Sequence, residues 1–191
     1  MDTASAGIHQ APILPNNRWP CLEEDLRGGV GLNLGCGQKL WPEWINADSE
    51  SEGADVKCDV RELPYEDSSV DVICAIHLIE HFYEWEAEGV LVEWRRVLKY
   101  GGRLILELPN MDKVFRYIGA CLVSGSRIEE QMTYWPFWGD PRSKQPGMCH
   151  KWGYTPDSMR ALLEVVGFRR IQQAPAKYHV PVRDMRFEAI K

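Results

Sequence analysis

The sequence predicts an α/β fold built on a parallel sheet. Short apolar strand candidates alternate with helical segments, the first strand candidate ends in a two-glycine turn, and the next two each end in an acidic residue. Strands that alternate with helices favour a parallel sheet with helices on both faces. The chain has 191 residues, 45% of them hydrophobic, which is enough for one domain with a sizeable core.

The first strand and its turn lie in residues 30–37. Leu32 and Leu34 suit a buried strand. Gly35 and Gly37 permit backbone angles and close approaches that a Cβ would block, as a bound nucleotide requires. Taken alone, the same turn is equally typical of an ordinary strand-to-helix corner.

Acidic residues follow the next strand candidates. The second candidate ends at Asp48, where a carboxylate can accept hydrogen bonds from both hydroxyls of a ribose, although a plain strand-end turn is the alternative. The third, residues 54–58, is followed by Asp59, for which helix capping is the alternative. The fourth, residues 69–75, leads into a helix predicted to start at Ile76.

Two later helices have clear signals. Residues 84–98 place apolar side chains at mostly helical spacing, and its aromatic residues suit a core better than a ligand platform. The second helix has Thr155 and Asp157 as candidate caps and Gly167 as its stop.

Five sequence elements occur in a fixed order and are more specific together than any one alone. They are Leu32-Asn33-Leu34-Gly35-Cys36-Gly37; Asn46-Ala47-Asp48; Cys58-Asp59-Val60 with Leu63-Pro64 and Val70-Asp71; Glu80-His81 with Leu98-Lys99-Tyr100-Gly101-Gly102; and Tyr154-Thr155-Pro156-Asp157-Ser158-Met159 through Val166-Gly167-Phe168. In this set the chain resembles the class I S-adenosylmethionine-dependent methyltransferases, in particular the small type 11 group. The resemblance covers roughly residues 30–171.

This resemblance implies a Rossmann-like, doubly wound fold. The sheet is then seven-stranded and mostly parallel with an antiparallel C-terminal strand, in a three-layer sandwich. Residues 180–191 are expected to be a strand that returns to the sheet edge, as in the family. Residues 1–28 are expected to be a flexible tail, and residues 29–191 a single methyltransferase domain.

Two features depart from the family pattern. Asn33 stands where an acidic residue is common, and the third glycine of the usual turn is missing. Only seven residues separate Gly37 from Ile45, with Pro42 among them, so the first helix must have about one or two turns or be absent.

The resemblance implies S-adenosylmethionine as the cofactor. The glycine turn is then expected to contact its methionine portion, Asp48 its ribose, and Asp59 with the Val60 N–H its adenine. A buried structural histidine is the alternative for His77. The full set of predicted cofactor-binding residues is Asn33, Leu34, Gly35, Cys36, Gly37, Asp48, Asp59, Val60 and His77.

His81 and His150 are the predicted catalytic residues. Methyl transfer is an in-line displacement that depends mainly on alignment, but a hydroxyl acceptor also needs a base, and histidine suits that task near neutral pH. The pair Glu80-His81 recurs in the group and either orients a base or ties the helix to the glycine turn. The histidines and cysteines show no metal-ligand spacing, so no metal is expected.

Residues 110–154 form an insertion that the core sheet does not require. It holds clustered aromatic and basic side chains around His150. Because substrates of doubly wound folds approach beyond the carboxyl ends of the strands, we expect a lid or substrate-binding insertion. A surface loop anchored by its own aromatic residues is the alternative. Members of the group with a similar segment are often associated with glycans, which suggests a sugar-type acceptor.

Charge is divided unevenly along the chain. Residues 1–110 hold 9 Lys and Arg against 20 Asp and Glu, whereas residues 111–191 hold 13 against 8. A solvated surface explains this, and an anionic acceptor also fits it. The chain has no dense basic stripe for nucleic acid, no apolar run of membrane-spanning length and no secretory signal pattern. Its six scattered cysteines predict free thiols in the cytoplasm.

Together these features predict a methyltransferase that uses S-adenosylmethionine on a small-molecule or glycan-type acceptor, at oxygen. A noncatalytic S-adenosylmethionine-binding protein of the same fold is the main alternative, because Asn33 and the shortened corner depart from the usual pattern. A nicotinamide-dependent oxidoreductase fits less well, since it has no use for Asp59 or the Glu80-His81 pair.

Overall fold

The computed structural model describes Leu26 and residues 29–191. Apart from Leu26, the expected N-terminal tail lies outside the described residues. The elements in chain order are β1 (Gly31–Leu34), β2 (Ile45–Asp48), β3 (Val56–Lys57), β4 (Val70–Ile76), η1 (Ile79–His81), α2 (Glu84–Val97), β5 (Leu98–Pro109), α3 (Met111–Ser124), η2 (Glu130–Met132), α4 (Tyr134–Trp138), η3 (Pro146–Met148), α5 (Pro156–Val166), β6 (Arg169–Pro175) and β7 (Asp184–Ile190).

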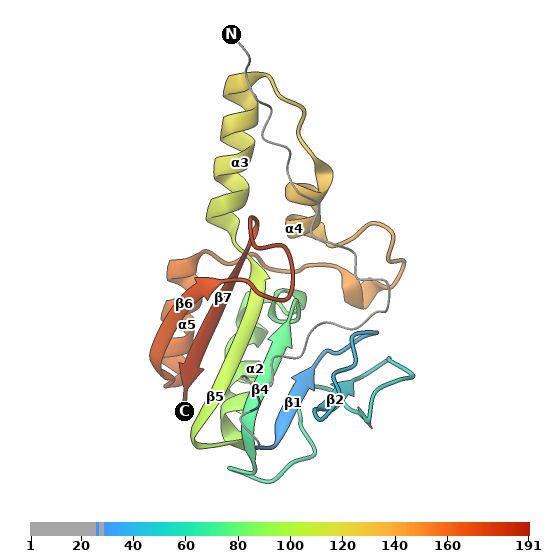
Figure 1. Ribbon diagram of the computed structural model, residues 1–191, viewed down its shortest axis with the longest axis vertical. Coiled ribbons are helices and arrows are strands. Elements are labelled where there is room, and N and C mark those ends of the chain that lie inside the picture. Colours follow the sequence, from blue (N-terminus) through green and yellow to red (C-terminus); the bar gives the residue numbers. More distant parts are fainter. Residues whose placement is uncertain (1–25, 27–28) are drawn as a thin grey trace.

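The strands form one seven-stranded sheet in the order β3-β2-β1-β4-β5-β7-β6 (Figure 1). Every pairing between the first five strands is parallel, and β7 pairs antiparallel with both β5 and β6, so β7 alone runs opposite to the other strands. The fold class predicted from the sequence is therefore confirmed.

The position of β7 corrects one expectation. The C-terminal strand is not at the sheet edge: Phe187 pairs with Leu106 of β5 on one side and with Gln173 of β6 on the other. Burial explains the order, because Met185, Phe187 and most of β7 are buried, whereas β6 is largely exposed and polar. A charged, polar strand suits an edge because it discourages pairing with other chains.

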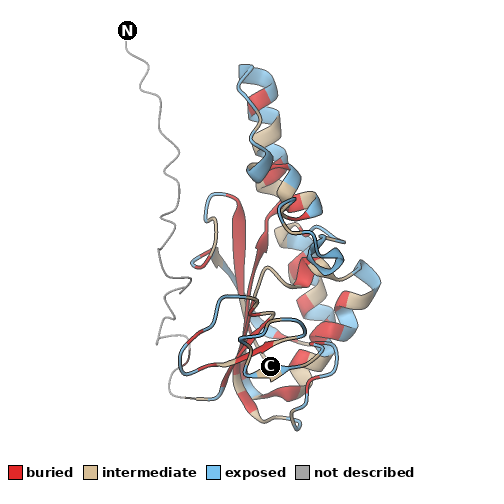
Figure 2. Cartoon of the chain, turned by 90° about the vertical axis from the view of Figure 1, so that its right-hand side faces the viewer, coloured by how far each residue is buried: buried red, intermediate tan, exposed pale blue. Residues whose placement is uncertain are grey.

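Alternate side chains of β4 pack into two separate apolar clusters, one on each face of the sheet. Ile73 and Ala75 face the cluster that α2 and α5 cover, and Val72 and Cys74 face the opposite one. Figure 2 shows the buried residues concentrated in the strands and on the inner sides of the helices.

Aromatic residues from loops cover the second face together with Leu26, which lies in a helix. Trp41 packs edge-on against Trp44 with ring centroids 5.0 Å apart, and Tyr178 lies 4.9 Å from Trp41 on its other side. Large aromatic side chains can cover this face because each buries a wide apolar area.

The helices confirm most sequence predictions. The helix predicted over 84–98 is α2, and the Thr155 hydroxyl caps α5 by accepting a hydrogen bond from the Ser158 N–H, 3.2 Å away. No helix lies between β1 and β2, as the short corner allows. The helix predicted to start at Ile76 is only the short turn η1, because His77 adopts a left-handed backbone conformation that helices exclude.

The insertion leaves the sheet after β5 and returns to it before α5. The Asn110 side chain caps α3 by accepting hydrogen bonds from the N–H groups of Asp112 and Lys113. The backbone of Asn110 also forms a β-bridge with Tyr154. Helix α3 projects away from the sheet, and α4 lies beside it (Figure 1). Aromatic residues pack within the insertion, with Phe115 5.9 Å from Phe137 between ring centroids. None of the helices in the described part of the chain combines the length and apolar composition needed to cross a lipid bilayer.

Candidate functional site

A pocket of approximately 760 Å³ opens at the carboxyl ends of the parallel strands. Residues that directly follow β1, β2, β3 and β4 line it, and the strand order reverses at this point, between β1 and β4. Doubly wound sheets bind their ligands in that crevice. Gln145, Met148 and Lys151 of the insertion complete the wall. The pocket therefore lies between the residues that follow the first four strands and the insertion.

The glycine turn leaves the backbone accessible from the pocket. Gly35 and Gly37 have φ values of +63° and +49°, in the left-handed region that favours glycine. A Cβ on Gly35 would lie 2.7 Å from the side chain of Leu78, whereas one on Gly37 would meet no atom within 4 Å. The turn is closed on the Leu78 side, and a ligand can approach the backbone at Gly37.

Asp48 connects the glycine turn to the loop after β2. Its Oδ2 accepts a hydrogen bond from the Gly37 N–H at 2.9 Å, and its Oδ1 accepts from Glu50 and Ser51 at 2.8 and 2.9 Å. A carboxylate has about four acceptor sites, so one remains, on Oδ2. In this arrangement Asp48 can accept one ribose hydroxyl, rather than the two that the sequence suggested.

Other predicted cofactor residues also line the pocket. These are Asp59, Val60 and His77. The side chain of Arg61 binds the Asp59 carboxylate, with Nη2 and Oδ2 2.7 Å apart, and these hydrogen bonds lower the pKa of Asp59. The carboxylate is about half exposed and keeps access to solvent on its other side.

Three predicted cofactor residues do not line the pocket. Asn33, Leu34 and Cys36 are buried. The Asn33 amide instead supports the corner, because Nδ2 donates to the Lys39 carbonyl at 2.8 Å and to the Asn46 side chain at 2.9 Å. Burial is the main cause that raises the pKa of the Cys36 thiol to about 11. The direct contacts predicted for these three residues stay predictions.

Four histidines gather beside the pocket although they are distant in sequence. Ring centroids lie 4.0 Å apart for His77 and His179, 4.8 Å for His81 and His150, and 6.4 Å for His77 and His150. His77 and His81 line the pocket, while His150 lies behind them. The structure thus brings the two predicted catalytic histidines together.

His77 stands between two buried carboxylates. Its Nδ1 lies 2.8 Å from Glu80 Oε1, and its Nε2 lies 2.9 Å from Asp184 Oδ2. Burial alone would lower the pKa of His77, but the two carboxylates outweigh burial and raise the pKa to about 9. Its φ of +51° is unusual for a residue with a Cβ, and such strain often occurs at functional sites.

The two carboxylates have opposite surroundings. Asp184 accepts hydrogen bonds from Arg183 at 2.6 Å and Val180 at 3.1 Å, and lies 2.6 Å from His179 Nδ1. Neither oxygen of Glu80, which is 1% exposed, has a hydrogen-bond partner in the part of the chain that the structure describes. Burial alone would raise the pKa of both groups, but in each case the charge of His77 leads the effects that lower it, for Glu80 to about 2.

The two remaining rings are oriented by backbone carbonyl groups. His150 Nδ1 lies 2.9 Å from the Pro136 oxygen, and His81 Nδ1 lies 3.2 Å from the Cys149 oxygen. Because a carbonyl oxygen only accepts, each Nδ1 is the donor, and in the neutral ring the lone pair lies on Nε2. Burial lowers the pKa of His150.

Comparison with known proteins identifies the core of the chain. Residues 36–106 match the model of a family described as "Methyltransferase domain". No curated protein sequence matches the chain.

Solved structures share the fold of this chain. A SAM-dependent methyltransferase from Archaeoglobus fulgidus is 18% identical, with a TM-score of 0.61 over 88% of this chain and 89% of that one. One from Methanosarcina mazei is 17% identical, with a TM-score of 0.59 over 89% and 94%. A protein from Thermotoga maritima described as a "possible histamine N-methyltransferase" is 17% identical, with a TM-score of 0.57 over 88% and 86%.

The family and the fold imply S-adenosylmethionine as the cofactor of the methyltransferase domain. The residues present fit this group. The open backbone at Gly37 admits a ligand that any side chain there would obstruct, and Asp48 keeps one acceptor site for a hydroxyl. The pocket between them is large enough for a nucleoside with its methionine tail.

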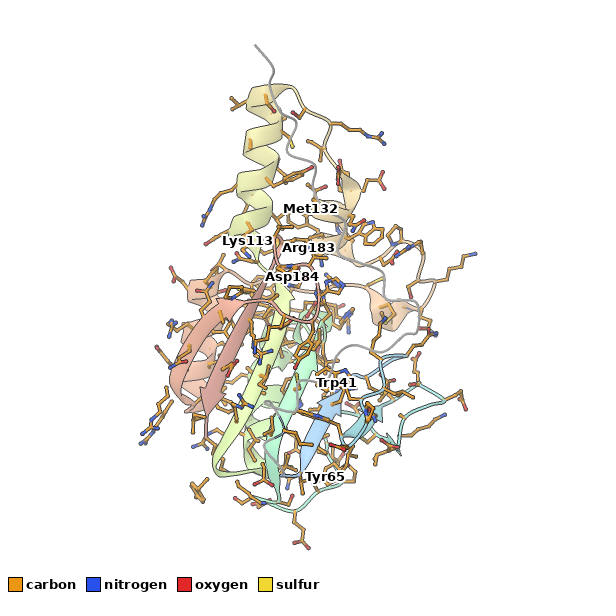
Figure 3. The ribbon with its side chains drawn as sticks, in the orientation of Figure 1. Trp41, Tyr65, Lys113, Met132, Arg183 and Asp184 are labelled. Carbon is orange, nitrogen blue, oxygen red and sulfur yellow. The ribbon has the colours of Figure 1, made fainter. Side chains whose placement is uncertain are left out.

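The charged residues in the loop before β7, which contact the histidine cluster, were not predicted from the sequence. Figure 3 shows Lys113, Arg183 and Asp184 together where α3 meets the start of β7. Lys113 Nζ donates to the Asp184 carbonyl at 2.6 Å, and Arg183 donates to the Gln131 carbonyl at 2.9 Å. The sequence offers one signal for them: Arg183 and Asp184 stand at the start of a strand predicted to be in the sheet, and charged residues that are buried need partners.

Proposed function

We propose that the protein is a methyltransferase that transfers a methyl group from S-adenosylmethionine to an oxygen of a small-molecule or glycan-type acceptor. The observation that carries the proposal is the shared pocket. Gly37 and Asp48 line it on the predicted cofactor side, Met148 and Lys151 line it from the insertion, and His81 is also in its wall.

Each part of the pocket has a task in this proposal. S-adenosylmethionine, when bound, supplies an electrophilic methyl group. Gly37 and Asp48 bind and orient that cofactor, and Met148 excludes water from the reacting atoms. The acceptor oxygen attacks the methyl carbon, the carbon–sulfur bond breaks with its electron pair staying on sulfur, and the hydroxyl proton passes to a base. His81, whose Nε2 keeps its lone pair at the pocket wall, is the best placed to receive it.

The insertion supports a polar, anionic acceptor. It contributes Lys151 to the pocket, and residues 111–191 carry an excess of positive charge. In the same proposal, residues 29–191 act as one domain in the cytoplasm. No disulfide joins two cysteines of the described part of the chain, which is in keeping with that compartment.

Calorimetric titration tests this proposal. Purified protein is titrated with S-adenosylmethionine and S-adenosylhomocysteine, with NAD as the control. We expect micromolar binding of the sulfur compounds, on the order of −8 kcal/mol, and none of NAD. Turnover is then sought with sugars and nucleotide sugars. Cofactor binding without turnover on any acceptor would favour the noncatalytic alternative, and absence of cofactor binding would refute both.

A further inference from the structure

We propose that His77, Glu80 and His150 bind a divalent transition-metal cation beside the methyl-transfer pocket. One ligand atom from each side chain, His77 Nδ1, Glu80 Oε1 and His150 Nε2, lies within 4.8 Å of the others. Two imidazoles and one carboxylate are a ligand set that Zn²⁺, Mn²⁺ and Fe²⁺ accept, with further positions left open. Sequence spacing did not predict this site because the fold, not a motif, brings His150 to Glu80.

The distances fit a common cation. Two ligand atoms on one tetrahedral metal, at bonds of about 2.1 Å, lie about 3.4 Å apart. Glu80 Oε1 lies 2.8 Å from His77 Nδ1 and 3.9 Å from His150 Nε2, on either side of that value. The 2.8 Å contact is an ion pair between His77 Nδ1 and Glu80 Oε1, so these two atoms already lie as close together as two ligands of one ion.

Glu80 supplies the independent observation that points to a ligand. A buried carboxylate normally accepts hydrogen bonds, because desolvating it without partners is costly. Oε1 of Glu80 has only the ion pair with His77, and Oε2 has no hydrogen-bond partner among the described residues. The buried hydroxyl of Tyr154, whose pKa is raised by burial and by the Glu80 charge, also has no such partner there. A cation would satisfy Glu80 in place of the missing donors.

The surroundings of the histidines are those of metal ligands. A ligating histidine usually donates its other ring N–H to a carboxylate or a backbone carbonyl, which fixes the ring and its tautomer. His77 has Asp184 at its other nitrogen, 2.9 Å away, and His150 has the Pro136 carbonyl at the same distance. Both rings are therefore held with their second nitrogen toward Glu80.

A second cluster, formed by His77, His179 and Asp184, is a weaker candidate. The Asp184 carboxylate already accepts hydrogen bonds from Arg183 and from the Val180 N–H, so its lone pairs are in use. The adjacent Arg183 guanidinium, whose side chain is only 4% exposed, also opposes a cation there. In this proposal His77 therefore binds the cation through Nδ1, beside Glu80, and donates a hydrogen bond from Nε2 to Asp184.

The cation would change the part that His150 plays. Its Nε2 would bind the metal, which leaves His81 as the histidine facing the acceptor. Because His77 lines the pocket, a cation on its Nδ1 lies next to the bound acceptor and can lower the pKa of a coordinated hydroxyl. This role, unlike the binding itself, rests on the proposed function.

Metal binding is measured on the full chain after dialysis against a chelator. Calorimetric titration with Zn²⁺ and with Mn²⁺ is expected to show one site, whereas Mg²⁺, which prefers oxygen ligands, is expected to bind far more weakly. Glu80→Gln and His150→Ala should each weaken Zn²⁺ binding by more than about 100-fold. His179→Ala, the matched control, should weaken it by less than about tenfold, because His179 contacts Asp184 and is one step further out than the outer-shell partners whose loss costs about 10- to 100-fold.

The outcomes separate this proposal from the proposed function. S-adenosylhomocysteine is titrated into the same samples, and thermal unfolding shows whether each variant is folded. If Glu80→Gln does not fold, His150→Ala, which removes an edge of the cluster, decides the test. Cofactor binding with no Zn²⁺ or Mn²⁺ site, or metal binding that His179→Ala abolishes and His150→Ala does not, would overturn the metal proposal alone.

Discussion

Asp48 holds the glycine corner together at the scale of single residues. Its carboxylate binds the N–H groups of Gly37, Glu50 and Ser51, which lie on two sides of the pocket. Removing it would release the turn as well as one acceptor for the cofactor. The residue therefore acts on binding through both geometry and direct contact.

Asp48→Ala should weaken S-adenosylhomocysteine binding by about 10- to 100-fold, because hydrogen bonds to a charged group are worth about 1.5–3 kcal/mol. The domain should stay folded, since the residue is half-buried and outside the apolar clusters. Calorimetry gives the affinity and thermal unfolding the stability. Asp112→Ala, on an exposed turn of α3, is the matched control, and equal affinities for the two variants would remove Asp48 from the site.

The order of strands in the sequence predicts well which segments reach the pocket. It predicts less well where their side chains point. Gly35, Gly37 and Asp48 line the pocket as expected, because they follow the carboxyl ends of β1 and β2. Asn33 and Cys36 do not, since a strand and a tight turn send successive side chains to opposite sides. His77 meets Asp184 across 107 positions of sequence, and no local pattern specifies such a contact.

At the scale of elements, helix α2 is tied to the loop after β3 by Glu93. Its carboxylate accepts from the Leu63 N–H and from Arg96, each at 2.7 Å. The Arg96 hydrogen bonds outweigh burial and lower the pKa of Glu93 below its usual 4.5. A lowered pKa in the folded state stabilises the fold above the unfolded-state pKa, and this stabilisation is lost as the pH falls through the folded-state pKa.

Glu93→Gln should therefore lower the free energy of unfolding by about 1–2 kcal/mol at neutral pH, at the lower end because Arg96 is about one-third exposed. The difference from the unsubstituted protein should shrink as the pH falls below 4.5. Urea unfolding across that range measures both. A cost that stays constant with pH would contradict a role for the carboxylate charge.

Strand β7 carries a charge pair in the interior of the sheet. Arg186 Nη1 lies 3.2 Å from Glu107 Oε1, and both side chains are fully buried. Glu107 also accepts from the N–H groups of Lys177 and Tyr178, which hold the loop over the tryptophan cluster. The pair thus links β5, β7 and the loop layer.

Arg186→Met should lower the free energy of unfolding by about 3–5 kcal/mol, because it leaves the Glu107 charge buried without its partner. Arg103→Met provides the comparison in the same sheet. Arg103 pairs with the partly exposed Glu188 at 3.1 Å, and Glu188 would keep Arg186 as a partner, so loss of Arg103 should cost less, about 1–2 kcal/mol. Urea unfolding of the two variants decides, and equal costs would show that burial of the pair is not what matters.

Apolar periodicity predicted α2 and α5 well because each buries one face against the sheet. It could not place β7, because edge and interior positions depend on which strands pair across the sheet. The same limit explains η1: the sequence from Ile76 has helical residue types, but His77 turns the backbone to reach Glu80 and Asp184. A tertiary requirement overrides the local preference there.

At the scale of the whole molecule, the pocket lies where the insertion meets the residues that follow β1 to β4. The N–H groups of Lys151 and Trp152 donate to the Glu80 carbonyl at 2.8 and 3.2 Å, and Met148 reaches the pocket beside them. Cofactor binding at Gly37 and closure by residues 145–151 are therefore expected to be coupled. The charge difference between the two halves of the sequence favours the same contact.

S-adenosylhomocysteine should slow amide hydrogen exchange in both parts together. Residues 35–37 are expected to gain protection through direct contact, and residues 145–151 because the ligand restricts their opening. The far end of α3, where Leu122 and Val123 are exposed and outside the pocket, serves as the internal control and should not change. Hydrogen exchange read by mass spectrometry, with and without ligand, resolves these segments. Protection confined to residues 35–37 would mean that the insertion is a surface loop anchored by its own aromatic residues and not a lid. Protection that spreads to the far end of α3 would instead indicate general stabilisation of the fold.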